Sequence, residues 1–130
     1  LAYNSSVFAA EDLVVVVHQT NSVSQMSKSE VIGLFMGKYA AFSSGKRALA
    51  VDLLDNHHGR SAFYQQLVGR SVASVNAYWS RIRFSGKRRP PIQLQDYSEV
   101  IDFMHQNSQA IGYLPRAMVS EQMKVVFELD

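Results

Sequence analysis

A continuous run of apolar residues near the start of the chain, residues 13–17 (LVVVV), limits its fold more than any other feature. Such a run gives a strand no polar face, so both of its faces must be covered, as in sheets with helices packed on either side. The run is also far shorter than the ~20 apolar residues that a membrane-spanning helix requires. The sequence therefore predicts a buried strand in an α/β sheet and no membrane insertion.

Helical patterns separate this run from further strand-like segments. Ser27 and Glu30 form a capping box ahead of an apolar stripe, and Asp96 and Glu99 repeat the pattern later. The predicted helices cover residues 28–36, 60–68, the segment between Ser71 and Gly86, and the segment between Asp96 and Asn107. The predicted strands cover residues 13–17, 48–54, 110–114 and 124–129. Strands that alternate with helices indicate one α/β domain, with a mostly parallel sheet flanked by helices.

Composition and the N-terminal residues bear on the cellular location of the protein. The chain has 130 residues, 47% of them apolar and 18% charged, which fits one globular domain. It contains no cysteine, so disulfides and thiolate chemistry are excluded. Val7 and Ala9 match the small-residue positions before a signal-peptidase cleavage site. We expect residues 1–10 to be a signal-peptide remnant or N-terminal extension of an exported protein, and residues 11–130 to form the domain. An ordinary N-terminal strand is the alternative.

The polar turn after the second predicted strand, residues 55–61 (DNHHGRS), is the best local candidate for a binding site. A helix start offers unpaired backbone N–H groups and the positive end of the helix dipole, which together favour an anion. A glycine there lets a ligand approach the backbone closely, and the next two residues add donors. The predicted ligand-binding residues are Asn56, His58, Gly59, Arg60 and Ser61. A capped helix with surface histidines is the alternative, because every helix start offers such donors.

Metal binding and catalysis find little support in the sequence. His57 and His58 are adjacent and therefore diverge, and no further ligand lies at a suitable spacing. Ser61 lies outside any G-x-S-x-G elbow and has no evident triad partners. We therefore predict no metal, no cofactor and no catalytic residue, and the chain is not expected to be an enzyme.

The densest positive charge is a secondary basic patch at Lys87, Arg88 and Arg89, followed by two prolines. Such a patch can hold phosphate groups of a ligand, a lipid or a nucleic acid. A run this short is more often a solvated turn. Nucleic acid is not predicted as a partner, since export would separate the protein from most nucleic acid.

Several segments resemble, in the same order, phosphate-type periplasmic substrate-binding proteins and in particular their short single-lobe relatives. The matching segments are residues 14–17 with 21–24, 31–38 (VIGLFMGK), 60–64 (RSAFY), 67–71 (LVGRS), 77–79 (AYW), 84–87 (FSGK) with Pro90 and Pro91, and 110–114 (AIGYL). Together they cover nearly all of residues 13–114.

The resemblance implies one lobe of the type 2 periplasmic-binding fold and a place in the periplasm. In the two-lobed members phosphate is held between the lobes, and one lobe contributes a Ser-Gly-Thr turn at a helix start. That turn falls at residues 58–60 here, where only Gly59 matches and Ser61 follows. A single lobe cannot close around its ligand.

The predicted function is therefore a periplasmic, phosphate-transporter-related module that binds phosphate or another small anion weakly or as a homo-oligomer. The alternative is a ligand-free protein-interaction or sensory module with the same fold, which would use a protein partner.

Overall fold

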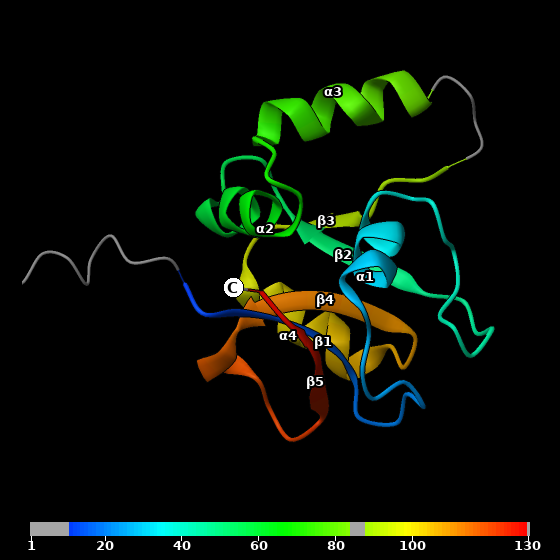
Figure 1. Ribbon diagram of the computed structural model, residues 1–130. Helices are drawn as coiled ribbons and strands as arrows, with labels where there is room; N and C mark the ends of the chain where they lie inside the picture. Colours follow the sequence, from blue (N-terminus) through cyan, green and yellow to red (C-terminus); the bar gives the residue numbers. More distant parts are fainter. Residues whose placement is uncertain (1–10, 84–87, 130) are drawn as a thin grey trace, which may run out of the picture.

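The computed structural model describes residues 11–83 and 88–129, which build one five-stranded sheet with four α-helices (Figure 1). In chain order the elements are β1 (Leu13–His18), α1 (Lys28–Phe35), β2 (Leu49–Leu53), α2 (His58–Val68), α3 (Val72–Arg83), β3 (Ile92–Leu94), α4 (Tyr97–Gln106), β4 (Ala110–Pro115), the short 3-10 helix η2 (Arg116–Met118) and β5 (Met123–Glu128). The expected signal-peptide remnant at residues 1–10 lies outside the described residues, and so does Lys87 of the basic patch.

The strand order across the sheet is β3-β2-β4-β1-β5. β2 pairs in parallel with β3 and β4, whereas β1 pairs antiparallel with both β4 and β5. Four strands therefore run in one direction and β1 runs against them between β4 and β5. The predicted α/β class with a mostly parallel sheet is confirmed, with the reversed β1 as its one departure among the described strands.

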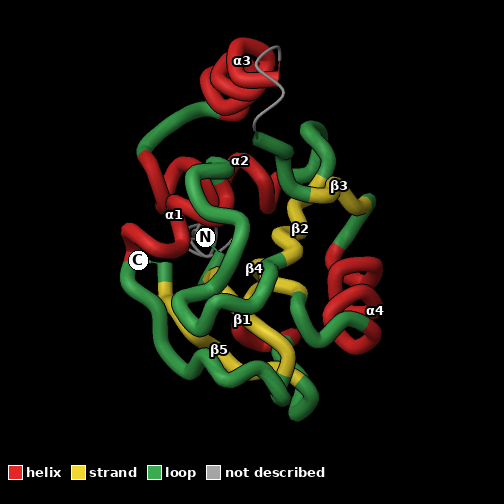
Figure 2. The backbone as a smooth tube through the Cα atoms, turned by 90° about the vertical axis from the view of Figure 1, so that its right-hand side faces the viewer, coloured by secondary structure: helices red, strands yellow, loops and turns green. Residues whose placement is uncertain are grey.

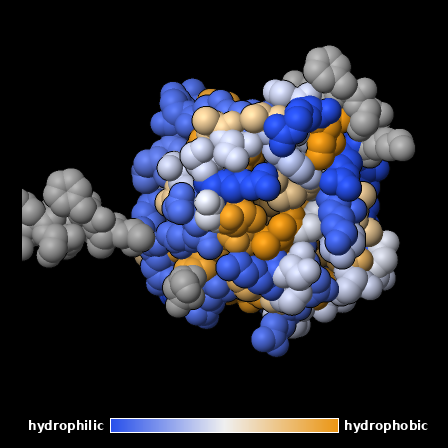
Figure 3. Space-filling view, turned by 45° about the horizontal axis from the view of Figure 1, so that its top comes forward, coloured by the Kyte–Doolittle hydropathy of each residue, from blue (hydrophilic) through white to orange (hydrophobic). Residues whose placement is uncertain are grey.

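Helices cover both faces of the sheet. Figure 2 shows α4 on one face and α1 and α2 on the other, with α3 lying outside α2. This arrangement explains the apolar run of β1, because its first five residues are completely buried and successive side chains point to opposite faces. On the outer side, the face that α1, α2 and α3 form carries apolar surface bordered by hydrophilic residues (Figure 3). Within the described ranges no helix is long and apolar enough to cross a membrane.

The helix starts follow local hydrogen bonding. Ser27 caps α1 reciprocally, since its hydroxyl accepts from the Glu30 N–H at 3.1 Å and the Glu30 carboxylate accepts from the Ser27 N–H at 2.8 Å. α2 begins at residue 58 rather than at the predicted residue 60. The cause is His57, whose ring Nδ1 accepts from the Gly59 N–H at 2.9 Å and serves as the N-cap. Residues 58 and 59 are therefore helical rather than part of the turn.

β3 is a strand that the sequence analysis did not predict. This three-residue strand follows the paired prolines and pairs in parallel with β2 at the edge of the sheet. Two of its three residues are exposed, so it lacks the apolar pattern by which a strand is recognised. Its position next to β2 brings the segment after α3 close to the end of β2, where the polar side chains described below meet.

Candidate anion site

A buried carboxylate, Asp52, forms the centre of the site. It lies on β2 with 1% of its surface exposed. An aspartate is almost never buried to this degree unless it has partners. Its carboxylate accepts hydrogen bonds from the Tyr64 hydroxyl at 2.5 Å, the Tyr113 hydroxyl at 2.5 Å and the Leu53 N–H at 2.7 Å. Three donors from α2, β4 and β2 itself therefore converge on one side chain, which makes the cluster a structured polar core.

Burial sets the protonation behaviour of this cluster. It raises the pKa of Asp52, although the neighbouring Arg60 charge and the hydrogen bonds from the tyrosines oppose the rise. Burial and the charge of Asp52 raise the pKa of both Tyr64 and Tyr113 well above the ordinary tyrosine value. The two hydroxyls therefore stay protonated at neutral pH and act as donors.

Arg60 supplies the positive charge of the site and is 3% exposed. Its Nε lies 3.5 Å from the Asp52 carboxylate and its Nη1 lies 3.4 Å from the Asp55 carboxylate. Its guanidinium carbon lies 5.1 Å from the centre of the Tyr64 ring. These are ion-pair distances, and neither Nε nor Nη1 has a hydrogen-bond acceptor among the described protein atoms. The indole N–H of Trp79 is buried without an acceptor in the same way.

Arg60 and Trp79 both line a pocket of about 250 Å³. It is lined by Asp52, Asp55, Arg60, Asn76, Trp79, Ser80, Pro90, Pro91 and Gln93, from the end of β2, the start of α2, one side of α3 and the segment around β3. Asn76 is held to the wall by a 2.9 Å hydrogen bond from its side-chain amide to Asp55. Ligands of open α/β sheets bind at the carboxyl ends of the strands, which is where this pocket lies relative to β2. The arrangement suits a small ligand that accepts hydrogen bonds from Arg60 and Trp79.

Of the five residues that the sequence points to, one lines this pocket, and that residue is Arg60. Asn56, His58 and Ser61 are exposed outside it. The His58 ring stacks on the His57 ring at 4.7 Å, and its Nε2 lies 3.2 Å from the Glu11 carboxylate. The structure thus brings the predicted residues together at one helix start but directs their side chains to different surroundings.

Gly59 is buried and has a packing role, in addition to the predicted one of letting a ligand approach the backbone. A Cβ at this position would overlap the Tyr97 hydroxyl and lie 3.0 Å from Leu53 Cδ1. Its N–H is engaged by His57, as described above. Glycine is needed here because Tyr97 of α4 packs against the backbone of α2. The role of Gly59 in ligand approach stays a prediction.

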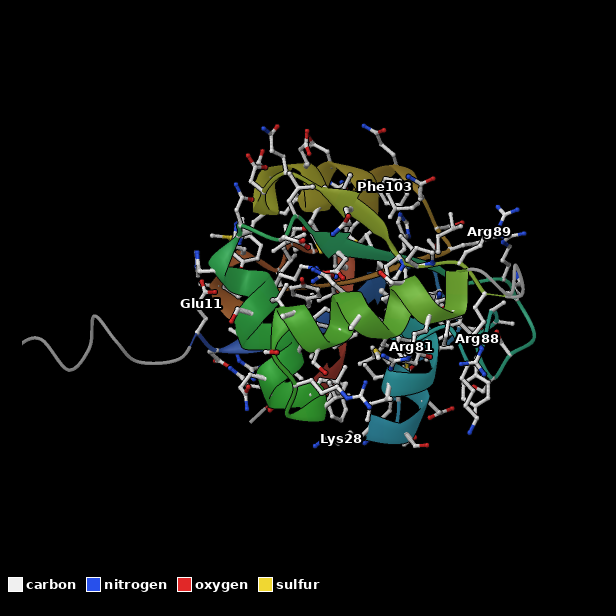
Figure 4. The ribbon with its side chains drawn as sticks, turned by 90° about the horizontal axis from the view of Figure 1, so that it is seen from above. Glu11, Lys28, Arg81, Arg88, Arg89 and Phe103 are labelled. Atoms are coloured by element: carbon white, nitrogen blue, oxygen red, sulfur yellow. The ribbon has the colours of Figure 1, made fainter. Side chains whose placement is uncertain are left out.

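The basic residues lie on another side of the molecule. Arg88 and Arg89 are exposed, and Figure 4 places them far from Glu11, which lies near the start of α2. Arg88 donates from Nη1 to the Tyr78 hydroxyl at 2.9 Å. Neither arginine lines the pocket, whereas the two prolines that follow them do. No group of three His, Asp or Glu side chains in the described parts of the chain is arranged to hold a metal ion.

The sequence matches no family model and no curated protein. Among solved structures, it is similar to an ABC-type phosphate transport receptor from Vibrio cholerae, with a TM-score of 0.71 at 16% identity over 89% of this chain and 45% of the receptor. The chain therefore has the fold of part of a phosphate-transport receptor.

Two further structures agree with this receptor-like fold. One, assigned as a phosphate ABC transporter substrate-binding protein from Clostridium perfringens and solved with bound phosphate, gives a TM-score of 0.72 at 15% identity over 89% of this chain and 44% of that one. The other, a possible phosphate binding protein from Planctomyces limnophilus, gives 0.65 at 14% identity over 89% and 40%. The chain spans less than half the length of each of these proteins.

Sequence reasoning missed the role of four site residues: Asp52, Tyr64, Tyr113 and Trp79. One signal was present, because an aspartate inside the apolar stretch of residues 48–54 must either be exposed or have buried partners. The three aromatic residues carried no such signal, since their polar atoms lie on side chains that fit an ordinary core pattern.

Proposed function

We propose that this chain is a solute-binding-like module that binds phosphate or a similar protonated oxyanion in the pocket beside Arg60. The observation that carries the proposal is that Arg60 and Trp79 line one pocket, while three of their donors, Arg60 Nε, Arg60 Nη1 and Trp79 Nε1, are buried without acceptors. A buried donor without an acceptor costs roughly 1–3 kcal/mol, so binding of a ligand oxygen that accepts from one of these donors would be favoured. The likeness to phosphate-transport receptors supports the same class of ligand.

The carboxylates of the pocket favour a ligand that carries a proton. Asp52 and Asp55 are hydrogen-bond acceptors when ionised and would repel a fully ionised anion. A monohydrogen or dihydrogen phosphate can donate to them while it accepts from Arg60 and Trp79. Sulfate has no proton at neutral pH, so it should bind less tightly than phosphate.

Asp55 provides the sharpest test. It is 59% exposed on its side chain and holds Arg60 Nη1 from the solvent side, so it competes with a bound oxyanion for the same donor. The Asp55→Asn variant should bind phosphate more tightly, by up to about fivefold if the exposed pair contributes up to about 1 kcal/mol. Asp102→Asn, an equal change of charge on the exposed side of α4, is the matched control and should leave the affinity unchanged.

Isothermal titration calorimetry of the two variants and the wild type with phosphate and with sulfate measures these affinities. Trp79→Phe keeps the ring packing and removes the N–H, so it should weaken phosphate binding. The proposal is wrong if none of the proteins binds phosphate at millimolar concentration, or if Trp79→Phe binds as tightly as the wild type. The absence of binding in every variant would favour the second candidate, a ligand-free interaction or sensory module, in which Asp52 and Asp55 alone compensate the charge of Arg60.

Export to the periplasm, and binding rather than catalysis, belong to the same proposal and rest on the likeness to transport receptors. Cell fractionation of the protein expressed from its complete gene tests the location. Recovery in the cytoplasm would contradict the proposed export without affecting the proposed ligand site.

A further inference from the structure

A groove runs across the outer face of the molecule between α1, the end of α2 and α3. Two hollows of about 710 Å³ and 500 Å³ share Lys28, Ile32, Met36 and Tyr78 in their walls and therefore lie next to each other. The first extends to Arg70 and the second to Lys38 and Arg88. We call this feature the α1–α3 groove. It shares no lining residue with the pocket beside Arg60.

The charge of the groove has one sign. Four cationic side chains line it, and no aspartate or glutamate does so among the described residues. In the described ranges none of the four forms an ion pair with a carboxylate, although Asp52, Asp55, Asp12 and Glu128 pair with arginines elsewhere. The four cations are Lys28, Lys38, Arg70 and Arg88. The groove is thus a concentrated positive surface in a protein whose formal net charge is only +2.

Tyr78 fixes two of these cations in place. Its hydroxyl donates to the Met36 carbonyl oxygen at 2.6 Å, which anchors α3 to the end of α1. The same oxygen accepts from Arg88 Nη1 at 2.9 Å, and the guanidinium carbon of Arg70 lies 5.9 Å from the centre of the ring. Arg70 and Arg88 therefore lie on a rigid support, which lowers the entropy lost when they bind an acid.

The floor of the groove is apolar. Ile32 of α1 and Met36, the cap residue at its end, line both hollows together with the cations, and the tyrosine ring adds a partly buried aromatic surface. Figure 3 shows apolar surface bordered by strongly hydrophilic residues on this face, and Figure 4 shows Lys28 and Arg88 on the same side of the molecule. An apolar floor with a basic rim matches a segment that alternates acidic and apolar side chains better than it matches a phosphate backbone or a flat membrane surface.

We propose that the α1–α3 groove is a docking surface for an acidic, partly apolar segment of a partner protein. Carboxylates of that segment pair with Arg70 and Arg88 at the rim, and an apolar side chain rests on Ile32 and Met36. The binding is independent of the anion pocket, because the two sites have separate walls.

Fluorescence anisotropy with a labelled 12-residue peptide of alternating Glu and Leu tests the proposal on the full chain. The wild type should bind this peptide and should bind a Gln-for-Glu version at least tenfold more weakly. Arg70→Gln/Arg88→Gln should lose about 2- to 20-fold in affinity, from two exposed pairs. Lys46→Gln/Lys124→Gln removes the same charge from a loop and from β5 and should bind as the wild type does. Unchanged thermal unfolding shows that each variant is folded.

Three outcomes would overturn the proposal. The first is that the acidic peptide does not bind. The second is that both double variants lose the same affinity, which would mean that binding reflects overall charge rather than the groove. The third is that another anionic partner binds more tightly than the peptide and with the same dependence on Arg70 and Arg88. Vesicles with 30% anionic lipid and a 12-nucleotide single-stranded DNA test this, and either result would assign the groove to a different class of partner.

Discussion

Replacing Gly59 by alanine separates packing from ligand access at the start of α2. Gly59 lies within a helix, where alanine is favoured over glycine by about 1 kcal/mol. The added Cβ, however, would overlap the Tyr97 hydroxyl and lie 2.9 Å from its ring carbon Cζ. Tyr97 would have to move, although its hydroxyl donates to Glu11 at 2.7 Å and its ring packs edge-on against His57 at 4.8 Å.

The magnitude follows from these opposing effects. Overpacking in a well-filled region costs about 1–3 kcal/mol. Losing a hydrogen bond to a charged acceptor adds about 1.5 kcal/mol or more. After subtraction of the helix preference, Gly59→Ala should lower the free energy of unfolding by about 1.5–3.5 kcal/mol. Gly33→Ala on α1 is the comparison, since its Cβ would overlap the ring of Tyr39, which is 42% exposed and free to swing into solvent at a smaller cost.

Urea denaturation of the wild type and the two variants measures the difference. We expect Gly59→Ala to be less stable than Gly33→Ala, while its phosphate affinity stays that of the wild type. If Gly59→Ala is more stable than the wild type, helix preference dominates and the packing argument is refuted. If instead the variant is stable but binds phosphate poorly, the sequence-based role of Gly59 in ligand approach was the better one.

Three further predictions concern the buried cluster and the helix caps. Tyr113→Phe removes a donor to the buried Asp52 and should lower the free energy of unfolding by about 1.5–3 kcal/mol in urea titrations, whereas Tyr39→Phe on the surface should have little effect. Burial, and next the neighbouring His58, lower the pKa of His57 below its ordinary value of 6.5. The unfolded chain therefore binds the proton more readily, and the folded protein loses stability as the pH falls through 6.5. His57→Asn keeps a capping acceptor and removes the titration, so thermal unfolding from pH 8 to 5 should show the wild type losing stability relative to the variant; parallel curves would contradict this. Ser27→Ala should lower the free energy of unfolding by about 0.5–2 kcal/mol in the same urea titration. An unchanged urea midpoint would mean that water replaces the cap of α1.

The parts of the fold that sequence predicted are those fixed by neighbours along the chain. The reciprocal cap at Ser27 needs only the residue three positions later, and it forms as expected. At the second box, Asp96 accepts from the Glu99 N–H as predicted, but the Glu99 carboxylate accepts from the Gln95 N–H at 2.6 Å instead of from the cap residue. The start of α2 was misplaced by two residues because histidine is not among the usual capping side chains.

The site depended on contacts that no local pattern contains. Asp52 takes one tyrosine hydroxyl from twelve residues away and another from 61 residues away, and only the fold brings them together. β3 is a strand only through its pairing with β2, since its own three residues carry no strand pattern. Sequence could identify Arg60 as a ligand-binding candidate from its position at a helix start, but it could not show that the side chain turns inward.

Two features of the pocket act in opposite directions, and their sizes decide how tightly an oxyanion binds. With both carboxylates ionised, Asp52, Asp55 and Arg60 carry a net negative charge, which disfavours an anion. The pair with Asp55 is partly exposed and contributes at most about 1 kcal/mol, so a ligand oxygen displaces it at little cost. Arg60 and the Trp79 N–H then gain acceptors, and each such gain relieves about 1–3 kcal/mol of unsatisfied donor. Asp52 cannot move away, because its three hydrogen bonds and its burial hold it in place, so its repulsion remains. The donors therefore outweigh the exposed pair, but the remaining repulsion from Asp52 opposes this gain, which favours a protonated phosphate bound weakly.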